Sequence, residues 1–541
     1  MNRAANIETL RSETFDILII GGGITGAGIA LDAAARGLKV ALLEKHDFAS
    51  GTSSRSTKLI HGGLRYLKQL EFALVKEVGS ERAIVHKLAP HLVVPEKMLL
   101  PLYEKRGLGY WLTSVGLKIY DWLAGVKTED QRRMLTRNQT LSYEPALKPD
   151  EVRGGAIYAE YRTDDARLTI EILKLASQKG ACIGNYLKAE GFLYTDTKIS
   201  GVSVVNLLDN TKFKVHARVV VNATGPWVDE LRVLNESRKG KQLHLTKGVH
   251  LVVPFHRLPV RQAIYFDVPD GRMIFAIPRG RITYIGTTDT DYTGSIDEVT
   301  ATRADAQYLV NAVNETFPQA LLTLADIESS WAGLRPLIHE EGKSASELSR
   351  KDEIFESPTG LISIAGGKLT GYRKMAERVV DKVIEIAFDH LDLLDCSTGK
   401  LTLPGGGFDT YAQVKQFEVE LATRLANLGV RGNEATNLVH LYGRQATLIV
   451  EHLERNLTQQ PERDLLLAQA WFAIRYEAAL FPLDFINRRS GLLFFDLPKI
   501  NRWVEPVVDF FATEFKWTEQ QRTDQLKLVL HALKEVVSFT T

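Results

Sequence analysis

Hydrophobic positions at the start of the chain switch between strand spacing and helix spacing. An apolar run covers residues 17–20, small apolar residues recur at helical spacing over 27–36, and a second apolar run covers 38–43. A short, continuous apolar run predicts a buried strand, and Gly37 suits the end of the helix between the two runs. This order predicts a βαβ unit with parallel strands.

Strand patterns dominate the middle of the chain. The runs with the spacing of an antiparallel sheet are 245–253, 262–266, 272–277 and 281–285. The dipeptide Arg279-Gly280 has the composition of a tight turn, so we expect the last two runs to form a hairpin.

Further strand and helix patterns lie within and beyond this region. Residues 218–225 read as a buried strand that ends in a Thr-Gly turn, and we expect this strand to join the sheet of the first unit. Residues 361–365 form a further strand, which leads through a glycine pair into a helix that ends near residue 387. Helical spacing also covers 71–88, and it resumes beyond the triple glycine at 405–407. A domain boundary is therefore expected near residues 395–410.

Composition narrows the class of protein. The 541 residues include 67 basic and 66 acidic side chains, so the net charge of +1 gives no reason to expect nucleic acid as a partner. Cys182 and Cys396 are far apart and lack metal-ligand spacing, which favours neither a disulfide framework nor a metal site. With no signal pattern and no stretch of about 18 apolar residues, we expect a cytoplasmic protein that is soluble or peripheral to a membrane.

The first glycine turn has the spacing of a dinucleotide-binding loop. In Gly21-x-Gly23-x-x-Gly26, the first glycine permits the tight turn, the second lets the backbone approach a pyrophosphate, and the third lets the helix pack closely on the strand. The helix N-terminus offers N–H groups to the phosphates. Glu44 ends the second strand and can accept hydrogen bonds from ribose hydroxyls. An ordinary glycine turn is the alternative, but the strands, helix and acid together favour dinucleotide binding.

A second strand-to-helix turn, Gly366-Gly-Lys-Leu-Thr370, carries similar chemistry. A helix N-terminus can stabilise the negative charge that reduction places on the pyrimidine end of a flavin. Lys368 could add a full positive charge, directed either to a flavin or to an anionic substrate. An ordinary glycine-rich turn is again the alternative.

Six motifs occur together and in order, and their combination is far more specific than any one of them. They are Gly21–Ala30, Thr52-Ser-Ser54 with Lys58–Tyr66, Tyr161–Arg167, Asn222–Trp227, Trp331–Pro336 and Gly366–Thr370. By these motifs the chain resembles the FAD-dependent glycerol-3-phosphate dehydrogenases of bacteria over roughly residues 13–540. The resemblance implies FAD as cofactor and oxidation of sn-glycerol 3-phosphate to dihydroxyacetone phosphate, with electrons passing to membrane quinone.

The resemblance also implies an architecture. The fold class is α/β: a glutathione-reductase-like FAD-binding Rossmann domain is interleaved with an antiparallel substrate domain over residues 13–395, and an all-helical C-terminal domain covers 400–541. The FAD-binding parts are expected at about 15–90, 155–228 and 355–390, and the substrate-binding parts at about 91–154 and 240–350. Peripheral attachment to the inner face of the cell membrane is implied by the lipid-soluble acceptor, and a homodimer is compatible with the resemblance.

Site residues follow from the motifs. The expected cofactor-binding residues are Gly21, Gly22, Gly23, Gly26, Glu44, Thr52, Ser53, Ser54, His61, Gly62, Gly63, Thr224, Gly225, Gly367, Lys368, Leu369 and Thr370. A phosphate dianion calls for Arg and Lys. The expected substrate-binding residues are Arg65, Tyr66, Arg335, Arg350, Lys368 and Thr370. For each charged member, a surface salt bridge is the alternative.

Oxidation of the substrate at C2 also needs a group that takes the hydroxyl proton. Histidine suits this role near neutral pH. His250 lies on a predicted strand of the substrate domain and is the favoured base, with Arg335 stabilising the developing alkoxide. His61 lies in the glycine-rich segment expected beside the flavin. Either histidine could instead have a structural role.

The best candidate for membrane contact is the segment 108–123. Its aromatic residues and nearby basic residues suit an interfacial helix, but an ordinary core-packing helix is the alternative. The late run 488–495 combines two arginines with apolar residues and could equally be buried.

Three other functions compete with the dehydrogenase. A flavin amine oxidase of the glycine- or sarcosine-oxidase type would need fewer basic groups for its carboxylate substrate. A glycerol-3-phosphate oxidase would pass electrons to O2, but such oxidases usually carry an insertion for which this chain is too short. A non-catalytic nucleotide-sensing protein is disfavoured by the cluster of basic residues. An NAD-linked enzyme is less favoured because the second set of cofactor contacts suits a permanently held FAD.

Overall fold

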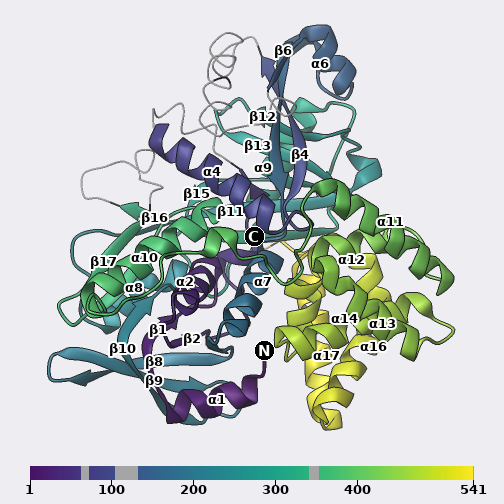
Figure 1. The fold of residues 1–541 in the computed structure, drawn as a ribbon. Coiled ribbons are helices and arrows are strands. Elements are labelled where there is room, and N and C mark those ends of the chain that lie inside the picture. The colour runs from purple at the N-terminus through teal and green to yellow at the C-terminus, as the bar shows by residue number, and fades with distance from the viewer. Residues whose placement is uncertain (62–71, 104–117, 119–131, 340–351, 540–541) are drawn as a thin grey trace.

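The computed structural model describes residues 1–61, 72–103, 118, 132–339 and 352–539. Two β-sheets lie beside a group of C-terminal helices (Figure 1). The described residues leave out 62–71 and 340–351. They also leave out the candidate membrane segment 108–123, except for Lys118.

The first sheet contains the predicted βαβ unit. Its strand order is β17-β18-β10-β1-β2-β7, with β9 pairing on β10 and β8 on β9. The strands are β1 (Thr14–Ile20), β2 (Val40–Leu43), β7 (Cys182–Gly184), β8 (Leu187–Thr195), β9 (Lys198–Asn206), β10 (Lys212–Asn222), β17 (Glu353–Glu356) and β18 (Leu361–Ala365). The central strands β18, β10, β1, β2 and β7 run parallel. The prediction that 218–225 joins this sheet is confirmed.

Burial of the first sheet on both faces explains the continuous apolar runs. Ile17 and Ile19 of β1 pack toward the helices α2 (Ile24–Ala35), α7 (Asp165–Gln178) and α10 (Tyr372–Ala387). Leu18 and Ile20 point to the opposite core, which includes the helix α1 (Arg3–Ser12). A parallel strand that is covered on both sides favours apolar side chains at successive positions. The helix α2 begins at Ile24, three residues earlier than predicted, because Gly23 is already its N-cap.

The second sheet is mainly antiparallel. Its order is β15-β11-β14-β13-β12-β4-β6-β3, with β16 beside β11 and β5 beside β6. The strands are β3 (Leu59–Ile60), β4 (Val94–Tyr103), β5 (Arg133–Thr136), β6 (Val152–Arg162), β11 (Gln242–Pro254), β12 (Ala263–Asp267), β13 (Met273–Arg279), β14 (Ile282–Gly286), β15 (Thr290–Asp291) and β16 (Ser329–His339). The predicted hairpin at Arg279–Gly280 joins β13 to β14. This sheet also includes β3 and β6, although the expected domain bounds put both with the FAD-binding parts.

Alternation along β11 assigns its two faces to different neighbours. Val249 and Leu251 pack with the helix α9 (Arg303–Thr316). Val252, two residues beyond His250, faces a core that includes C-terminal helices. Because successive side chains of a strand point to opposite faces, His250 lies on the face away from α9.

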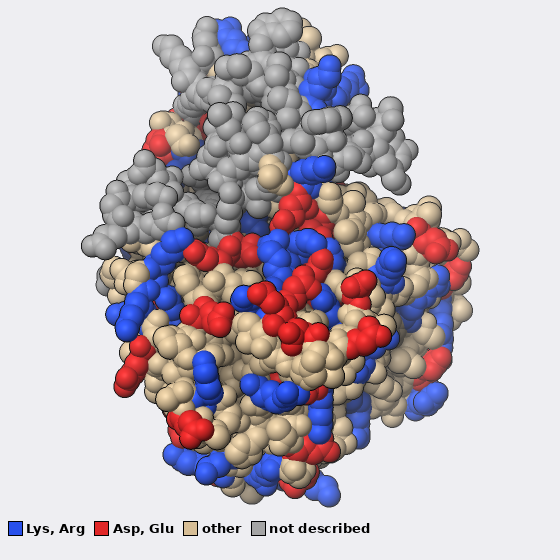
Figure 2. All heavy atoms as spheres, turned by 60° about the vertical axis from the view of Figure 1, so that its left-hand side comes forward, with Lys and Arg blue, Asp and Glu red and all other residues tan. Residues whose placement is uncertain are grey.

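Charged residues join α4 (Phe72–Leu88) to α10. Arg373 of α10 pairs with Glu81, and Arg378 pairs with Glu77 at 3.1 Å. Figure 2 shows basic and acidic side chains intermixed over this side of the molecule.

The C-terminal region is helical, as predicted. Its elements are α11 (Tyr411–Asn427), α12 (Glu434–Tyr442), α13 (Ala446–Asn456), α14 (Pro461–Glu477), a π-helical segment (Asp484–Arg489), α15 (Leu492–Phe495), α16 (Leu497–Phe515) and α17 (Glu519–Glu535). Among the described helices, none is both long and apolar enough to cross a membrane.

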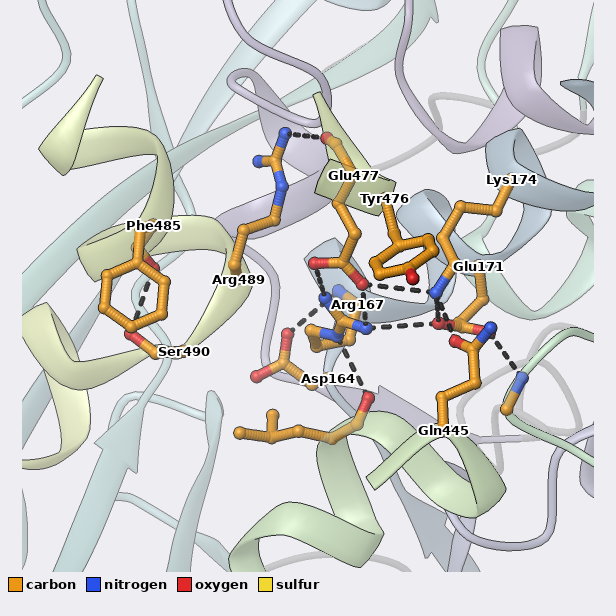
Figure 3. Close-up of polar contacts among 12 residues, drawn as sticks. Asp164, Arg167, Glu171, Lys174, Gln445, Tyr476, Glu477, Phe485, Arg489 and Ser490 are labelled. Atoms are coloured by element: carbon orange, nitrogen blue, oxygen red, sulfur yellow. Dashed lines mark hydrogen bonds and ion pairs between the residues drawn. The ribbon is translucent and has the colours of Figure 1, made fainter. Parts of the chain in front are cut away.

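Buried charges dock the helical domain on α7. The guanidinium of Arg167 donates two 2.7 Å hydrogen bonds to the carboxylate of Glu477, and it also bonds Glu171 (Figure 3). Lys174 lies 2.7 Å from Glu171 and 3.2 Å from Glu477. Glu171 also accepts the N–H of Gly405, in the linker between the domains, at 2.8 Å. These charges satisfy one another in a region that excludes water.

A second buried contact connects the π-helical segment to the loop after Glu44. Asp47 accepts hydrogen bonds from Arg488 at 2.5 Å and from Arg489 at 2.6 and 2.8 Å. Arg489 also donates to the backbone carbonyl of Glu477 at 2.9 Å. The late run 488–495 is thus anchored in the interior by its two arginines.

We expect Glu477→Ala to lower the free energy of unfolding by about 3–5 kcal/mol, because two buried cations, Arg167 and Lys174, would then share the one remaining carboxylate of Glu171. Burial by itself would raise the pKa of Glu477, but Arg167 and Lys174 outweigh it and lower the pKa from 4.5 to about 2. The contribution is therefore present above pH 4.5 and lost as the pH falls toward 2.

Urea unfolding followed by circular dichroism measures this effect. Glu420→Ala, which removes an exposed carboxylate from α11, is the matched control. A loss for Glu477→Ala of less than about 1 kcal/mol, the value of a surface pair, would contradict the assigned role.

Candidate active site

A cavity of about 1580 Å³ opens between the two sheets. The expected site residues on its wall are Gly21, Gly23, Glu44, Thr52, Ser53, His61, Thr224, Gly225, His250, Arg335, Gly367, Lys368, Leu369 and Thr370. Gly22 and Ser54 lie behind this wall, in the loops that shape it, and Gly26 lies behind it in the first turn of α2. Gly62, Gly63, Arg65, Tyr66 and Arg350 fall outside the described residues. The structure therefore brings both predicted turns and both predicted catalytic residues to one cavity.

The first turn forms a tight cradle at the carboxyl ends of the parallel strands. A methyl group added at Gly26 would lie 1.9 Å from the carbonyl oxygen of Gly21, so only glycine allows α2 to approach β1 this closely. The backbone N–H groups of Gly22 and His46 donate to the Glu44 carboxylate at 2.7 and 2.9 Å. Burial raises the pKa of Glu44 despite these bonds. The remaining lone pairs of Glu44 suit hydroxyl donors.

A loop rich in hydroxyl groups, residues 50–58, connects the cradle to the second sheet. Ser53 Oγ accepts the N–H of Ile24, at the first turn of α2, at 2.9 Å. Thr52 Oγ1 donates to the carbonyl of Leu334 in β16 at 2.8 Å. One loop thus contacts the start of the nucleotide-binding helix and the strand that carries Arg335.

A buried ion pair holds the end of this loop. Lys58 and Asp165 are 2% and 0% exposed, and Lys58 Nζ lies 2.5 Å from Asp165 Oδ1. Lys58 also donates to the carbonyl of Ser54 at 3.0 Å, and Asp165 accepts the N–H of Ser56 at 3.0 Å. Asp165 therefore ties the loop to the first residue of α7.

The second turn also lines the cavity, at the end of β18 in the same sheet as the first turn. Gly366 and Gly367 have φ of +76° and +79°, a backbone conformation that favours glycine. Thr370 Oγ1 donates to the backbone carbonyl of His61 at 3.2 Å, which fixes the short β3 segment to this turn. The His61 ring makes an edge contact with Phe275 at 6.3 Å. Lys368 and the N-terminal end of α10 provide positive electrostatic potential here.

His250 is held rigidly on the wall contributed by the second sheet. Its ring stacks on Trp331 with a centroid separation of 4.8 Å and an interplanar angle of 9°. Its Nε2 lies 3.0 Å from Thr57 Oγ1, and its side chain is 1% exposed. Burial, with added repulsion from Arg335 and Lys58, holds the pKa of His250 well below 6.5. The ring is therefore neutral at physiological pH.

Arg335 occupies the same wall, where hydrogen bonds fix its guanidinium. It donates to Asp289 Oδ1 at 3.0 Å, to the carbonyl of Thr288 at 3.2 Å and to Thr287 Oγ1 at 3.1 Å. The side chain is 29% exposed, so it can still contact a molecule in the cavity. A fixed guanidinium beside a neutral imidazole can bind an oxyanion while the ring accepts a proton.

Three residues on or next to the cavity wall have no role predicted from the sequence. They are Thr57 and Trp331, which contact His250, and Asp297, which accepts hydrogen bonds from Lys45 at 2.7 Å and from Trp227 at 2.9 Å. Thr57 lies in the same hydroxyl-rich loop as Ser53, and Trp331 lies in a motif with Arg335, so local signals existed for both. Asp297 belongs to no motif.

No group of three or more metal-binding side chains occurs in the part of the chain that the structure describes.

Comparison with known proteins identifies two matching family models. Residues 16–373 match the FAD dependent oxidoreductase family, and residues 396–522 match the C-terminal domain of alpha-glycerophosphate oxidase. The aerobic glycerol-3-phosphate dehydrogenase of Bacillus subtilis is 47% identical over 98% of this chain and 97% of its own length. The enzyme of the same name from Staphylococcus haemolyticus is 44% identical over 99% of this chain and 97% of its own length.

A solved structure is similar over the whole fold. The glycerol-3-phosphate dehydrogenase from Bacillus halodurans, crystallised with FAD, has a TM-score of 0.84 and 43% identity. The match covers 99% of this chain and 98% of that one. The expected α/β architecture with a helical C-terminal domain is thereby confirmed.

We expect Gly26→Ala to abolish retention of the dinucleotide, because the added methyl group would force α2 away from the turn at Gly21. Flavin absorbance of the purified protein measures retention. Gly399→Ala is the matched control, since a methyl group there would meet its nearest neighbour at 3.7 Å, an ordinary contact. Normal flavin content in Gly26→Ala would show that the close approach is not required.

Proposed function

The chain belongs to the family of aerobic, FAD-dependent glycerol-3-phosphate dehydrogenases, and we propose that it oxidises sn-glycerol 3-phosphate to dihydroxyacetone phosphate. The observation that carries this proposal is that the glycine turn at Gly21–Gly26, neutral His250 and the fixed guanidinium of Arg335 contribute to the wall of one cavity.

The residues present fit FAD. The cradle at Gly21–Gly26 and the buried Glu44 suit the pyrophosphate and ribose, and the turn at 366–371 suits the pyrimidine end of the flavin. When bound, FAD supplies N5, the atom that accepts a hydride from C2 of the substrate. Around it, the chain's own part is to bind the phosphate, to orient C2 and to remove the hydroxyl proton.

Arg335 and Lys368, with Thr370, would bind the substrate anion. Arginine forms paired hydrogen bonds with phosphate, whereas lysine acts as a point charge. Both cations lie on the cavity wall, one on β16 and the other in the turn before α10. Arg65, Tyr66 and Arg350 complete the proposed set on the strength of the family resemblance.

His250 would take the proton of the C2 hydroxyl. Its depressed pKa keeps the ring unprotonated, and the negative charge of a bound phosphate would raise that pKa toward the working range. Arg335 would stabilise the developing alkoxide. His61 would have a structural role beside the flavin, consistent with the use of its backbone carbonyl by Thr370.

Membrane quinone would receive the electrons, and the protein would attach peripherally to the inner face of the cell membrane. The family resemblance supports this part of the proposal, as it does a homodimer. The candidate interfacial segment is 108–123.

Anaerobic addition of sn-glycerol 3-phosphate to the purified yellow protein tests the proposal. We expect rapid loss of the oxidised-flavin absorbance with this substrate and none with glycine or sarcosine, because a phosphate matches the cations on the cavity wall. Bleaching by glycine or sarcosine alone would favour a flavin amine oxidase and contradict the proposal.

Reoxidation of the bleached protein tests the electron acceptor. We expect a soluble quinone analogue to restore the oxidised band much faster than O2 does. Faster reoxidation by O2, with formation of peroxide, would identify a glycerol-3-phosphate oxidase instead.

Arg335→Ala should abolish bleaching by glycerol 3-phosphate and leave FAD bound, because the proposed partner of Arg335 is the substrate. Removing one such charge-stabilising donor typically lowers the rate about 10²–10³-fold. Arg424→Ala is a control, since Arg424 pairs with Glu454 between α11 and α13 and does not line the cavity. Unchanged bleaching with a normal KM in Arg335→Ala would overturn the assignment.

A further inference from the structure

We propose that the Thr57 hydroxyl relays the C2 proton of the substrate to His250. This inference rests on the proposed function and adds a residue to it. It rests on the positions of the two His250 ring nitrogens and on the Thr57 hydroxyl, which lies beside one of them.

Only one nitrogen of His250 faces a polar group. Nδ1 is buried and has no hydrogen-bond partner among the described residues, so a proton from the cavity has no route to it. Nε2 lies 3.0 Å from Thr57 Oγ1, and Thr57 itself lines the cavity. A proton that reaches His250 from the cavity therefore arrives at Nε2, where the Thr57 hydroxyl already stands.

The ring cannot turn to present Nε2 directly to a substrate. Trp331 stacks against one face at 4.8 Å. Gly286, on the neighbouring strand, leaves the space that the ring edge fills, since a methyl group there would lie 2.1 Å from His250 Cδ2. Residues on both flanking strands thus confine the imidazole to one orientation.

Thr57 is held just as firmly as His250. Tyr284 donates its hydroxyl to the Thr57 backbone carbonyl at 3.2 Å, and the Trp331 indole donates to the carbonyl of Ser56 at 3.1 Å. Lys58, the next residue, is anchored on Asp165. The aromatic residue that stacks on His250 therefore also fixes the loop that carries the relay hydroxyl.

The relay balances as a concerted transfer from an alcohol. With the imidazole proton on Nδ1, Thr57 Oγ1 donates to Nε2 and its lone pairs can accept the C2 hydroxyl. The substrate O–H bond breaks as Oγ1 takes that proton, while the original Oγ1 proton passes to Nε2. The C2–H bonding pair leaves as hydride to the bound FAD, and the C2–O bond becomes the ketone. Thr57 ends unchanged, and His250 gains the proton.

Thr57→Val and Thr57→Ser separate the hydroxyl from the shape of the side chain. We expect Thr57→Val to slow flavin reduction by glycerol 3-phosphate by about 10²-fold, the usual value of a positioned proton-transfer group. The substrate concentration for half-maximal rate should stay near that of the unaltered protein, because the hydroxyl does not bind the phosphate. Thr57→Ser should retain most of the rate of flavin reduction, and that rate should keep the solvent isotope effect of the unaltered protein.

Thr246→Val is the matched control. Thr246 lies on β11 four residues before His250, and its buried hydroxyl has no partner among the described residues. The same chemical change there should leave flavin reduction unaltered. Flavin content and melting temperature establish that each variant is folded, and Thr57→Ala replaces Thr57→Val if the latter loses FAD.

The outcomes separate the relay from the proposed function. Slow Thr57→Val with fast Thr57→Ser supports the relay. Unchanged reduction of Thr57→Val overturns it, and so does a Thr57→Ser variant that holds FAD but is as slow as Thr57→Val. If the unaltered protein is not bleached by glycerol 3-phosphate, the proposed function fails and the relay fails with it.

Discussion

The ion pair between Lys58 and Asp165 is the interaction on which the geometry of the site depends. Both groups are buried, at 2% and 0% exposure, and removing two charges from water is expensive. An apolar pair could stabilise the fold as well, so the function of this ion pair is better understood as positional. It fixes a loop that contacts α2 through Ser53, β16 through Thr52 and His250 through Thr57. The Lys58–Asp165 pair thus fixes the loop that contacts α2, β16 and His250.

The helical domain supports the cofactor side through the same kind of interaction. Asp47 lies three residues after Glu44, and two arginines from the π-helical segment bind it. Arg489 also donates to the backbone carbonyl of Glu477, and the Glu477 carboxylate pairs with Arg167 on α7 (Figure 3). Fully paired charges of this kind specify a single arrangement of two surfaces, because any shift would leave a buried charge unpaired. The position of Glu44, the proposed ribose-binding carboxylate, therefore depends on residues more than 400 positions away.

The wall formed by the second sheet combines rigidity with suitable electrostatics. Stacking on Trp331 fixes the His250 ring, and burial near Arg335 and Lys58 keeps it neutral. Hydrogen bonds from Arg335 to Asp289 and Thr287 orient the guanidinium before any ligand binds. Groups that are already oriented and desolvated lose little free energy to reorganisation during a reaction, which is how such sites favour charge that develops at a chosen atom.

The sequence alone determined the parts of this protein that depend on neighbouring residues. Gly21–Gly26 predicted the cradle because its turn, helix and strand are local, and the mainly apolar runs at 17–20 and 361–365 predicted buried strands because burial on both faces favours apolar side chains. The tertiary structure decided what depends on contacts between distant segments. His250 meets Thr57 across 193 positions, and Arg167 meets Glu477 across 310. No periodicity encodes such pairings, because strand order and domain docking, rather than spacing along the chain, bring those side chains together.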